Sequence, residues 1–250
     1  MLWARKTANM EIVEAPSNKG LARSIIGAVA QLTEAHGRVI VIEDDLILHP
    51  SALDWFNRAL DRFADDPQVF HVTAYQFPTP AFRERKEGML LPFISSWGWA
   101  TWGRAWTAFD PAATGWEDLV SDAARRRAFN LDDSFPLAEY LTAQMQGRHD
   151  SWASRWAWSV FKAGGQAVFP PTSLVRNMGF DETATHNGLG IFRRLVHMPE
   201  PILWRGAEAP DLPRGPAAAA DLRAFKTGLR STGAMARARI KAFLRRLRGA

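Results

Sequence analysis

The chain has 250 residues, of which 47% are hydrophobic and 23% charged, a balance that predicts one globular domain and excludes a disordered chain. It has no cysteine, which excludes a disulfide framework, a thiolate metal site and a cysteine nucleophile, and favours a reducing compartment such as the cytoplasm. The apolar runs are far shorter than the roughly 20 residues that cross a bilayer, and no leader pattern is visible, so we expect neither a spanning segment nor export.

The formal net charge of +5 is unevenly distributed along the chain. Residues 222–250 contain nine Lys and Arg and no acid; of the 31 basic residues, 22 therefore remain in residues 1–221, against 26 acidic ones, a net charge of −4. A negative main body argues against a nucleic-acid partner.

The first half of the chain alternates strand and helix patterns. A short strand is predicted over Glu11–Ala15, then a turn over Ser17–Gly20. Apolar residues then recur at helical spacing: Leu21, Ile25, Ile26, Val29 and Leu32. The β-branched run Arg38–Ile42 is typical of a strand buried in a parallel sheet, and Val69–Tyr75 predicts another strand. Between them, Ser51 is expected to cap a helix whose apolar face is formed by Leu53, Phe56, Leu60 and Phe63.

This alternation predicts an α/β domain with a parallel sheet. Residues 77–115 show no clear period, residues 118–146 look helical in pieces broken at Pro136, residues 152–163 form a Trp-rich helix, and Gln166–Phe169 is a last strand. We expect a main domain over residues 1–198, a Pro- and Ala-rich linker over 199–221, and a basic amphipathic tail over 222–250.

Three acids, Glu43, Asp44 and Asp45, directly follow the first β-branched strand. Adjacent carboxylates repel each other, and their position at the mouth of a sheet is explained if they hold a divalent cation, which prefers oxygen ligands. The alternative is a solvated acidic turn that precedes the next helix.

Five motifs in order resemble a known family: Asn18-x-Gly20, Glu43-Asp44-Asp45, the SWGWATW run from Ser96 to Trp102, the DSWxxRW run from Asp150 to Trp156, and the NxGFDxxxTH run from Asn177 to His186. The order is similar to that of bacterial sugar transferases that use nucleotide-diphosphate sugars and have the GT-A fold. More distantly it resembles N-acetylglucosaminyltransferase I. The resemblance covers about residues 11–190.

The resemblance implies a Rossmann-like GT-A sheet with flanking helices, and it implies roles for the acids. Asp45 would coordinate Mn²⁺ or Mg²⁺, and Glu43 and Asp44 would contact the donor sugar nucleotide. Asp150 would be the catalytic base of an inverting single displacement; N-acetylglucosaminyltransferase I has two adjacent acids in this motif, whereas Ser151 stands second here.

The resemblance also implies donor contacts elsewhere. Asn18 and Gly20 would face the nucleotide, although a plain turn explains these residue types equally well. His186 would approach the diphosphate from a glycine-punctuated lid, whereas a lone histidine is more often structural.

Four tryptophans, Trp97, Trp99, Trp152 and Trp156, could stack on acceptor sugars because their flat rings offer large contact areas. The alternative is that they pack in the core, which is common for tryptophans at helical spacing.

Members of the family begin with another β-α unit that holds the base, and no residues here match it. We therefore expect a sheet without its first β-α unit, and either a longer working protein or weakened donor binding.

The expected function is metal-dependent transfer of a sugar from a nucleotide-diphosphate sugar to a glycan or lipid-linked acceptor in surface polysaccharide biosynthesis. The alternatives are a non-catalytic nucleotide-sugar or carbohydrate-binding protein and, less well supported by the negative body, a metal-dependent phosphohydrolase or nuclease. The tail over 222–250 predicts peripheral contact with the inner face of the cell membrane, or else docking on the body.

Overall fold

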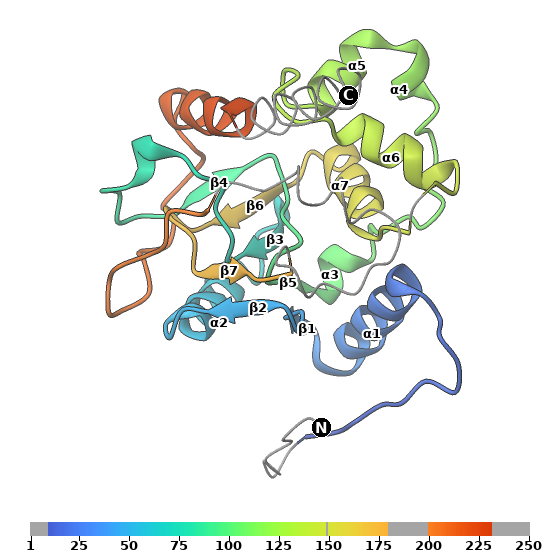
Figure 1. Cartoon of the computed structure of the whole chain (residues 1–250), viewed down its shortest axis with the longest axis horizontal. Helices are drawn as coiled ribbons and strands as arrows, with labels where there is room; N and C mark the ends of the chain where they lie inside the picture. Colours follow the sequence, from blue (N-terminus) through green and yellow to red (C-terminus); the bar gives the residue numbers. More distant parts are fainter. Residues whose placement is uncertain (1–9, 149, 180–199, 232–250) are drawn as a thin grey trace, which may run out of the picture.

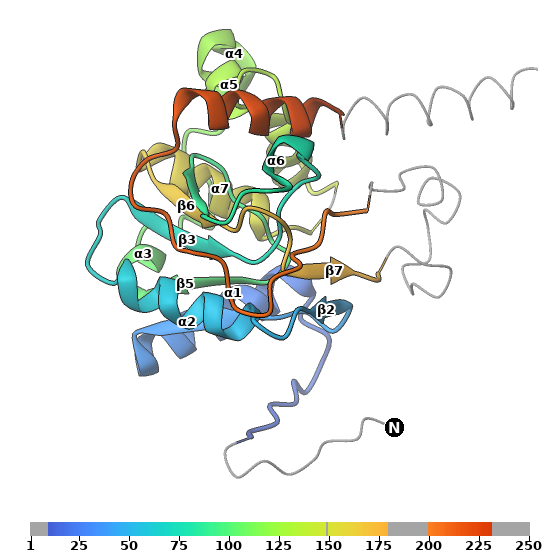
Figure 2. The same ribbon diagram turned by 90° about the vertical axis from the view of Figure 1, so that its left-hand side faces the viewer.

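The computed structural model describes residues 10–148, 150–179 and 200–231, which fold as an α/β protein with a mixed sheet flanked by helices, compatible with a Rossmann-like fold (Figure 1). Helices α4, α5 and α6 lie together at one end of the molecule, and α1 and α2 lie at the other (Figures 1 and 2).

The first predicted strand is absent, but the helix after it is confirmed. Residues 10–19 are exposed and irregular, because no strand in the described ranges pairs with Glu11–Ala15. Helix α1 covers Leu21–His36 and ends at Gly37, whose φ of 74° is the left-handed conformation that glycine adopts without strain.

The main sheet has five strands in the order β1-β5-β3-β6-β4. Their bounds are β1 Arg38–Val41, β3 Val69–Thr73, β4 Met89–Leu91, β5 Trp99–Trp102 and β6 Gln166–Phe169. Strand β5 runs antiparallel to both β1 and β3, β3 runs parallel to β6, and β4 runs antiparallel to β6. The prediction of a parallel sheet is therefore wrong in part.

Strand β1 lies at the edge of this sheet and pairs with β5 through Arg38↔Trp102 to Val41↔Trp99. Of its residues, Val39 is buried and Ile40 and Val41 are half-buried. The prediction that this run lies buried inside a parallel sheet is wrong, because an edge strand is covered by one neighbouring strand instead of two.

Helix α2, Ala52–Arg62, is confirmed, and of its predicted apolar face Phe56, Leu60 and Phe63 are buried. Leu53 is 52% exposed, whereas Trp55 is fully buried and its indole N–H donates to the carbonyl of Thr73. Ser51 precedes the helix without capping it through its side chain, and its hydroxyl instead hydrogen-bonds His49 Nδ1.

The helical pieces predicted over residues 118–146 and the Trp-rich helix predicted over 152–163 are confirmed as α4 Asp118–Ser121, α5 Ala123–Phe129, α6 Leu137–Met145 and α7 Ala153–Lys162. The 3-10 turn η1 Pro80–Phe82 and helix α3 Gly103–Trp106 lie in the region without a clear period and were not predicted. A second sheet pairs β2, Leu46–Leu48, with β7, Val175–Asn177, in antiparallel register. This small sheet starts directly after the acidic triplet.

The segment predicted as a linker lies along the body. Isolated β-bridges connect Leu203 to Ser173, Asp211 to Glu87 and Pro216 to Leu90. Residues 219–231 are helical, and Phe225 and Leu229 are fully buried in the core. The start of the predicted basic tail thus docks on the body, as the alternative interpretation has it, while residues 232–250 lie outside the described ranges.

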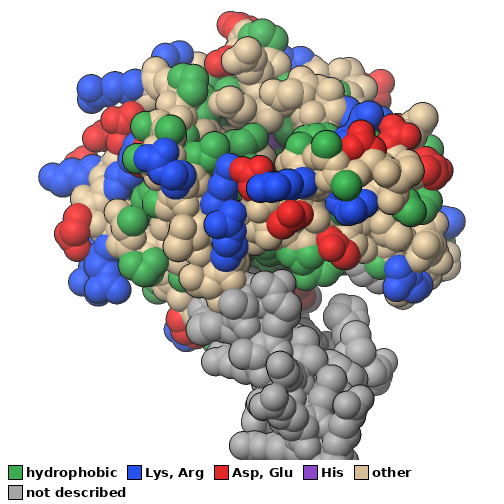
Figure 3. Space-filling model, turned by 90° about the horizontal axis from the view of Figure 1, so that it is seen from above, with side chains coloured by type: hydrophobic (Ala, Val, Ile, Leu, Met, Phe, Trp, Pro, Cys, Tyr) green, Lys and Arg blue, Asp and Glu red, His purple; other side chains and the backbone are tan. Residues whose placement is uncertain are grey.

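Charges of both signs are intermingled over the face seen in Figure 3. Lys226, in the helical segment 219–231, pairs with Asp132, and Arg125, in α5, pairs with Asp118. Within the described ranges, no helix combines the length and the apolar character needed to span a membrane.

Candidate functional site

Strand direction brings several predicted site residues to one edge of the main sheet. Strands β1, β3 and β6 run the same way, so their C-terminal ends meet at one edge. Glu43–Asp45 follow β1, Tyr75 and Gln76 follow β3, and the run 95–98 enters the antiparallel strand β5 from this same edge. In open α/β sheets, ligands bind in the crevice outside the carboxyl ends of the strands.

The N-terminus of α1 lies at this edge too, because α1 packs against β1 and is joined to it by Gly37 alone. Before the helix, the side chain of Asn18 accepts a hydrogen bond from the Gly20 amide at 2.8 Å, and Gly20 has a φ of 78°. This closes the predicted Asn-x-Gly turn in a conformation that favours glycine.

The carboxylate of Asp150 sits on this helix N-terminus. Its Oδ2 accepts from the Ala22 amide at 3.1 Å, and a Cβ added at Gly20 would be 2.9 Å from the same oxygen. The partial positive charge of a helix N-terminus stabilises a carboxylate there. The structure therefore joins Asn18, Gly20 and Asp150, three residues that the sequence predicted separately.

The acidic triplet has an uneven environment. Glu43 and Asp45 are half-buried, and Asp44 is exposed. Burial, together with repulsion by Asp45 and Asp44, raises the pKa of Glu43 to about 7. The cluster is therefore electrostatically strained, and a bound cation would relieve the strain.

Asp45 is held against the end of β7. Its carbonyl accepts from the Met178 amide at 2.8 Å, and a Cβ added at Gly179 would be 2.1 Å from its Oδ2. Its other oxygen, Oδ1, is buried with no hydrogen-bond partner in the part of the chain that the structure describes. Asn177 Oδ1 in turn accepts from the Gly179 amide at 2.7 Å, which fixes the turn that packs on Asp45.

These acids fit a divalent cation that is bound together with a phosphate ligand. Among the described residues, no group of three or more His, Cys, Asp or Glu side chains is arranged to hold a metal. Mg²⁺ is usually bound by one or two carboxylates together with substrate phosphates. The buried Asp45 Oδ1, which has no partner among the described residues, suits this kind of binding. The predicted donor contact His186 lies outside the described residues.

Three of the four predicted sugar-stacking tryptophans lie in the core. Trp99 and Trp156 are fully buried, and Trp152 is 2% exposed. The rings of Trp99 and Trp152 stack at 4.4 Å between centroids, and Trp99 also stacks on His71 at 5.3 Å. Because their faces are covered by protein, these three are corrected to core residues, which is the alternative that helical spacing also predicts.

Trp97 is different, because it is half-buried and faces a pocket. Its ring meets that of Tyr75 edge-on at 4.5 Å between centroids. The pocket has a volume of about 220 Å³. Trp97 is thus the one of the four tryptophans whose surroundings allow ligand contact.

Arg155, the arginine of the DSWxxRW motif, was not predicted to have a role. Its Nε donates to the carbonyl of Ser151 at 3.2 Å, and its Nη1 donates to the carbonyl of Pro111 at 3.3 Å. It therefore connects the residue next to Asp150 to the loop that precedes α4. Its place in the same short motif as Asp150 was the signal that could have indicated this role.

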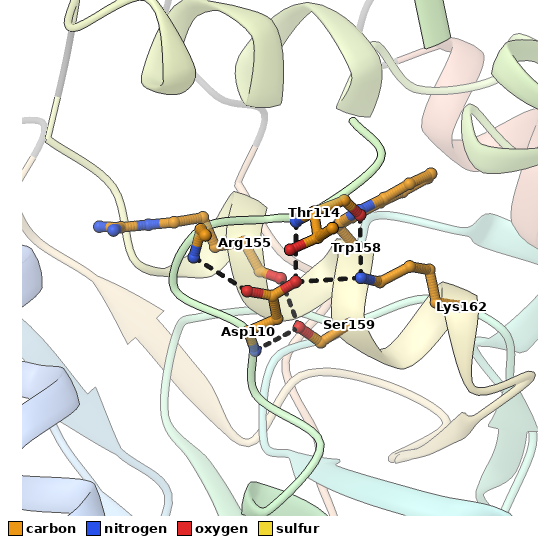
Figure 4. A network of polar contacts seen from close by, with 7 residues as sticks. Asp110, Thr114, Arg155, Trp158, Ser159 and Lys162 are labelled. Atoms are coloured by element: carbon orange, nitrogen blue, oxygen red, sulfur yellow. Dashed lines mark hydrogen bonds and ion pairs between the residues drawn. The ribbon is translucent and has the colours of Figure 1, made fainter. Parts of the chain in front are cut away.

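The same loop is anchored on α7 by a polar network (Figure 4). Asp110 accepts from the Thr114 amide at 2.7 Å and from Lys162 Nζ at 3.1 Å, and its own amide donates to the Ser159 hydroxyl. Desolvation alone would raise the pKa of Asp110, but the hydrogen bonds from Thr114 and Lys162 outweigh it and hold the pKa below its usual value. The network gives Arg155 a fixed partner at Pro111.

Comparison of the chain with protein-family models and with curated proteins found no match.

Proposed function

We propose that this chain is a glycosyltransferase that moves a sugar from a nucleotide-diphosphate sugar to a hydroxyl acceptor. The observation that carries the proposal is the contact of Asp150 with the N-terminus of α1, beside the Asn18–Gly20 turn and at the sheet edge to which Glu43–Asp45 belong. A candidate base and candidate diphosphate-binding groups are thereby assigned to one edge.

Within the α/β class, the arrangement of the sheet supports assignment to the GT-A fold. The acidic triplet follows an edge strand that pairs with an antiparallel neighbour, and the small β2–β7 sheet connects the triplet to the Asn177–Gly179 turn. Four of the five motifs that carry the resemblance thus belong to the same edge of the sheet in this structure, and the fifth begins at the β7 turn.

The donor half of the site would bind an anion. The Ala22 amide is taken by Asp150, so the anion would use the other backbone amides at the start of α1, where the helix favours negative charge and Asn18 fixes the turn. Asp45, with Glu43 and Asp44 beside it, would hold Mn²⁺ or Mg²⁺. When bound, such an ion neutralises the charge that develops on the departing diphosphate.

Asp150 would act as the general base. As the acceptor oxygen bonds to the anomeric carbon, the bond from that carbon to the diphosphate oxygen breaks, and Asp150 takes the proton of the acceptor hydroxyl. One displacement of this kind inverts the anomeric configuration. Arg155 would position the Asp150–Ser151 backbone through the Ser151 carbonyl.

The acceptor is proposed to be a glycan or lipid-linked molecule of surface polysaccharide synthesis, used on the cytoplasmic side. Because Phe225 and Leu229 are buried in the body, any membrane contact of the basic tail would fall to residues 232–250.

The proposal is tested by calorimetry with UDP-, GDP- and dTDP-sugars, each with and without Mn²⁺. We expect one donor class to bind in a manganese-dependent manner and to lose that binding in Asp45→Ala. Asp54→Ala is the matched control, because Asp54 is an exposed acid of α2 that pairs with Arg58. No donor binding, or equal binding in Asp45→Ala, would contradict the proposal.

A further inference from the structure

The pocket beside Trp97 is walled mainly by aromatic side chains. Phe77, Phe93 and Phe135 meet one another edge-on, with ring centroids 5.4–5.8 Å apart. Tyr75 and Leu137 continue the wall. Such a surface offers dispersion contacts and few hydrogen bonds.

None of the described residues that line this pocket is charged, and the polar groups of their side chains are serine and tyrosine hydroxyls and the Trp97 indole N–H. A nucleoside diphosphate would place two or more negative charges there without a counter-charge, so the pocket does not suit the donor. It is chemically distinct from the acidic triplet at the same sheet edge.

The pocket adjoins the candidate base. Ser151, the residue after Asp150, lines it, and Ser154 in the first turn of α7 lines it too. A molecule held in the pocket therefore has one end next to the Asp150 backbone.

Two of the lining residues carry buried hydroxyls without partners. Tyr75 Oη and Ser154 Oγ are buried and have no hydrogen-bond partner within the described ranges, and their residues are 1% and 5% exposed. Buried polar groups normally have a partner, so a bound molecule whose oxygen atom reached either hydroxyl would satisfy it.

We propose that this pocket binds an uncharged apolar group, alkyl or aryl, that the acceptor carries next to the hydroxyl that reacts. The inference rests on the proposed function and specifies its substrate class: an amphipathic acceptor instead of a free sugar. The apolar group lies against Phe77, Phe93 and Phe135, and the oxygen-bearing end lies toward Ser151.

The test compares methyl, phenyl and octyl β-D-glucopyranosides, which share one sugar and differ in the apolar group, by calorimetry below the micelle-forming concentration. We expect the octyl or the phenyl glucoside to bind at least about tenfold tighter than the methyl glucoside, as burial of several carbons predicts. Comparison of the phenyl and octyl glucosides shows whether the pocket prefers an aryl group or an alkyl chain. Equal affinities for all three would overturn the proposal.

Leu137→Asp places a charge in the pocket wall at the first residue of α6, where a helix N-terminus tolerates an acid. Leu53→Asp is the matched control, since Leu53 is 52% exposed in the first turn of α2 and lies away from the pocket. We expect Leu137→Asp to lose the tight binding and Leu53→Asp to keep it. Unchanged binding in Leu137→Asp would overturn the proposal.

If Leu137→Asp does not fold, Tyr140→Ala replaces it, because Tyr140 lines the pocket and is 46% exposed. Weaker octyl glucoside binding then supports the proposal, and unchanged binding overturns it. Because donor binding is measured separately, intact manganese-dependent donor binding without a preference among the glucosides would refute the pocket assignment alone.

Discussion

The Asp150 carboxylate accepts a hydrogen bond from the Ala22 amide at 3.1 Å, although 128 positions separate the two residues in the chain. The contact fixes the loop before α7 to the start of α1, which are the two segments with the predicted base and the predicted nucleotide turn. A substitution that removes the charge of Asp150 but keeps this accepting oxygen is expected to affect the chemistry more than the fold.

Asp150→Asn is expected to reduce sugar transfer by about 10²–10⁴-fold, the range that loss of a general base produces, and to leave donor binding unchanged. Asparagine keeps an oxygen that can accept from Ala22. Release of nucleoside diphosphate in the presence of an acceptor measures the loss, and calorimetry measures donor binding.

The matched control is Asp122→Asn. Asp122 accepts from the Arg125 amide at 2.9 Å at the start of α5, so it makes a similar helix N-terminal contact away from the candidate site. We expect normal transfer in this control. Retained transfer in Asp150→Asn would remove Asp150 from the mechanism.

Gly179→Ala is expected to displace the Asp45 carboxylate, because the added Cβ would lie 2.1 Å from Asp45 Oδ2. Manganese-dependent donor binding should weaken by about tenfold or more, which corresponds to ~1.4 kcal/mol. Calorimetry measures this loss.

Gly27→Ala is the control for Gly179→Ala. A Cβ at Gly27 meets nothing within 4 Å, and alanine in the middle of α1 should stabilise the fold by ~0.5–1 kcal/mol. Donor binding that is equal in the two variants would show that the position of Asp45 is irrelevant to donor binding.

Arg155→Ala is expected to lower the turnover number and to leave donor affinity unchanged, because it frees the Ser151 carbonyl without touching the acidic triplet. The control on the same helix is Lys162→Ala, which removes a partly exposed ion pair with Asp110 worth ~1 kcal/mol or less, while the Thr114 and Ser159 bonds still hold the loop. Steady-state kinetics separate the two: turnover should fall in Arg155→Ala and stay normal in Lys162→Ala. An equal fall in both would make Arg155 a structural residue of the network.

The elements that the sequence predicted correctly are those with a strong local period. Helix α7 and strand β3 follow from the spacing of their own side chains. Strands β4 and β5 were not predicted, because all their residues are buried and no polar alternation marks them. The edge position of β1 could not be predicted either, since it depends on a partner about 60 residues away, β5.

The site was predictable as a set of motifs but not as an arrangement. The contact of Asp150 with α1 depends on strand directions that no local pattern encodes. The tryptophan predictions failed at Trp152 and Trp156 because helical spacing is the same for a ring that packs in the core and a ring that stacks on a ligand.

His71 predicts a pH dependence of stability. It is fully buried, and burial lowers its pKa from 6.5 to about 3. Its Nε2 lies 2.9 Å from the Ser95 carbonyl oxygen, and its Nδ1 lies 3.2 Å from the Trp156 indole nitrogen. The unfolded chain binds a proton here below pH 6.5 and the folded chain does not, so the contribution is full above pH 6.5 and is lost as the pH falls toward about 3. Urea unfolding over this range should show a decrease in the free energy of unfolding that is steeper than in His71→Gln by up to ~1.4 kcal/mol per pH unit. Parallel pH profiles for the two proteins would mean that His71 takes up its proton in the folded core.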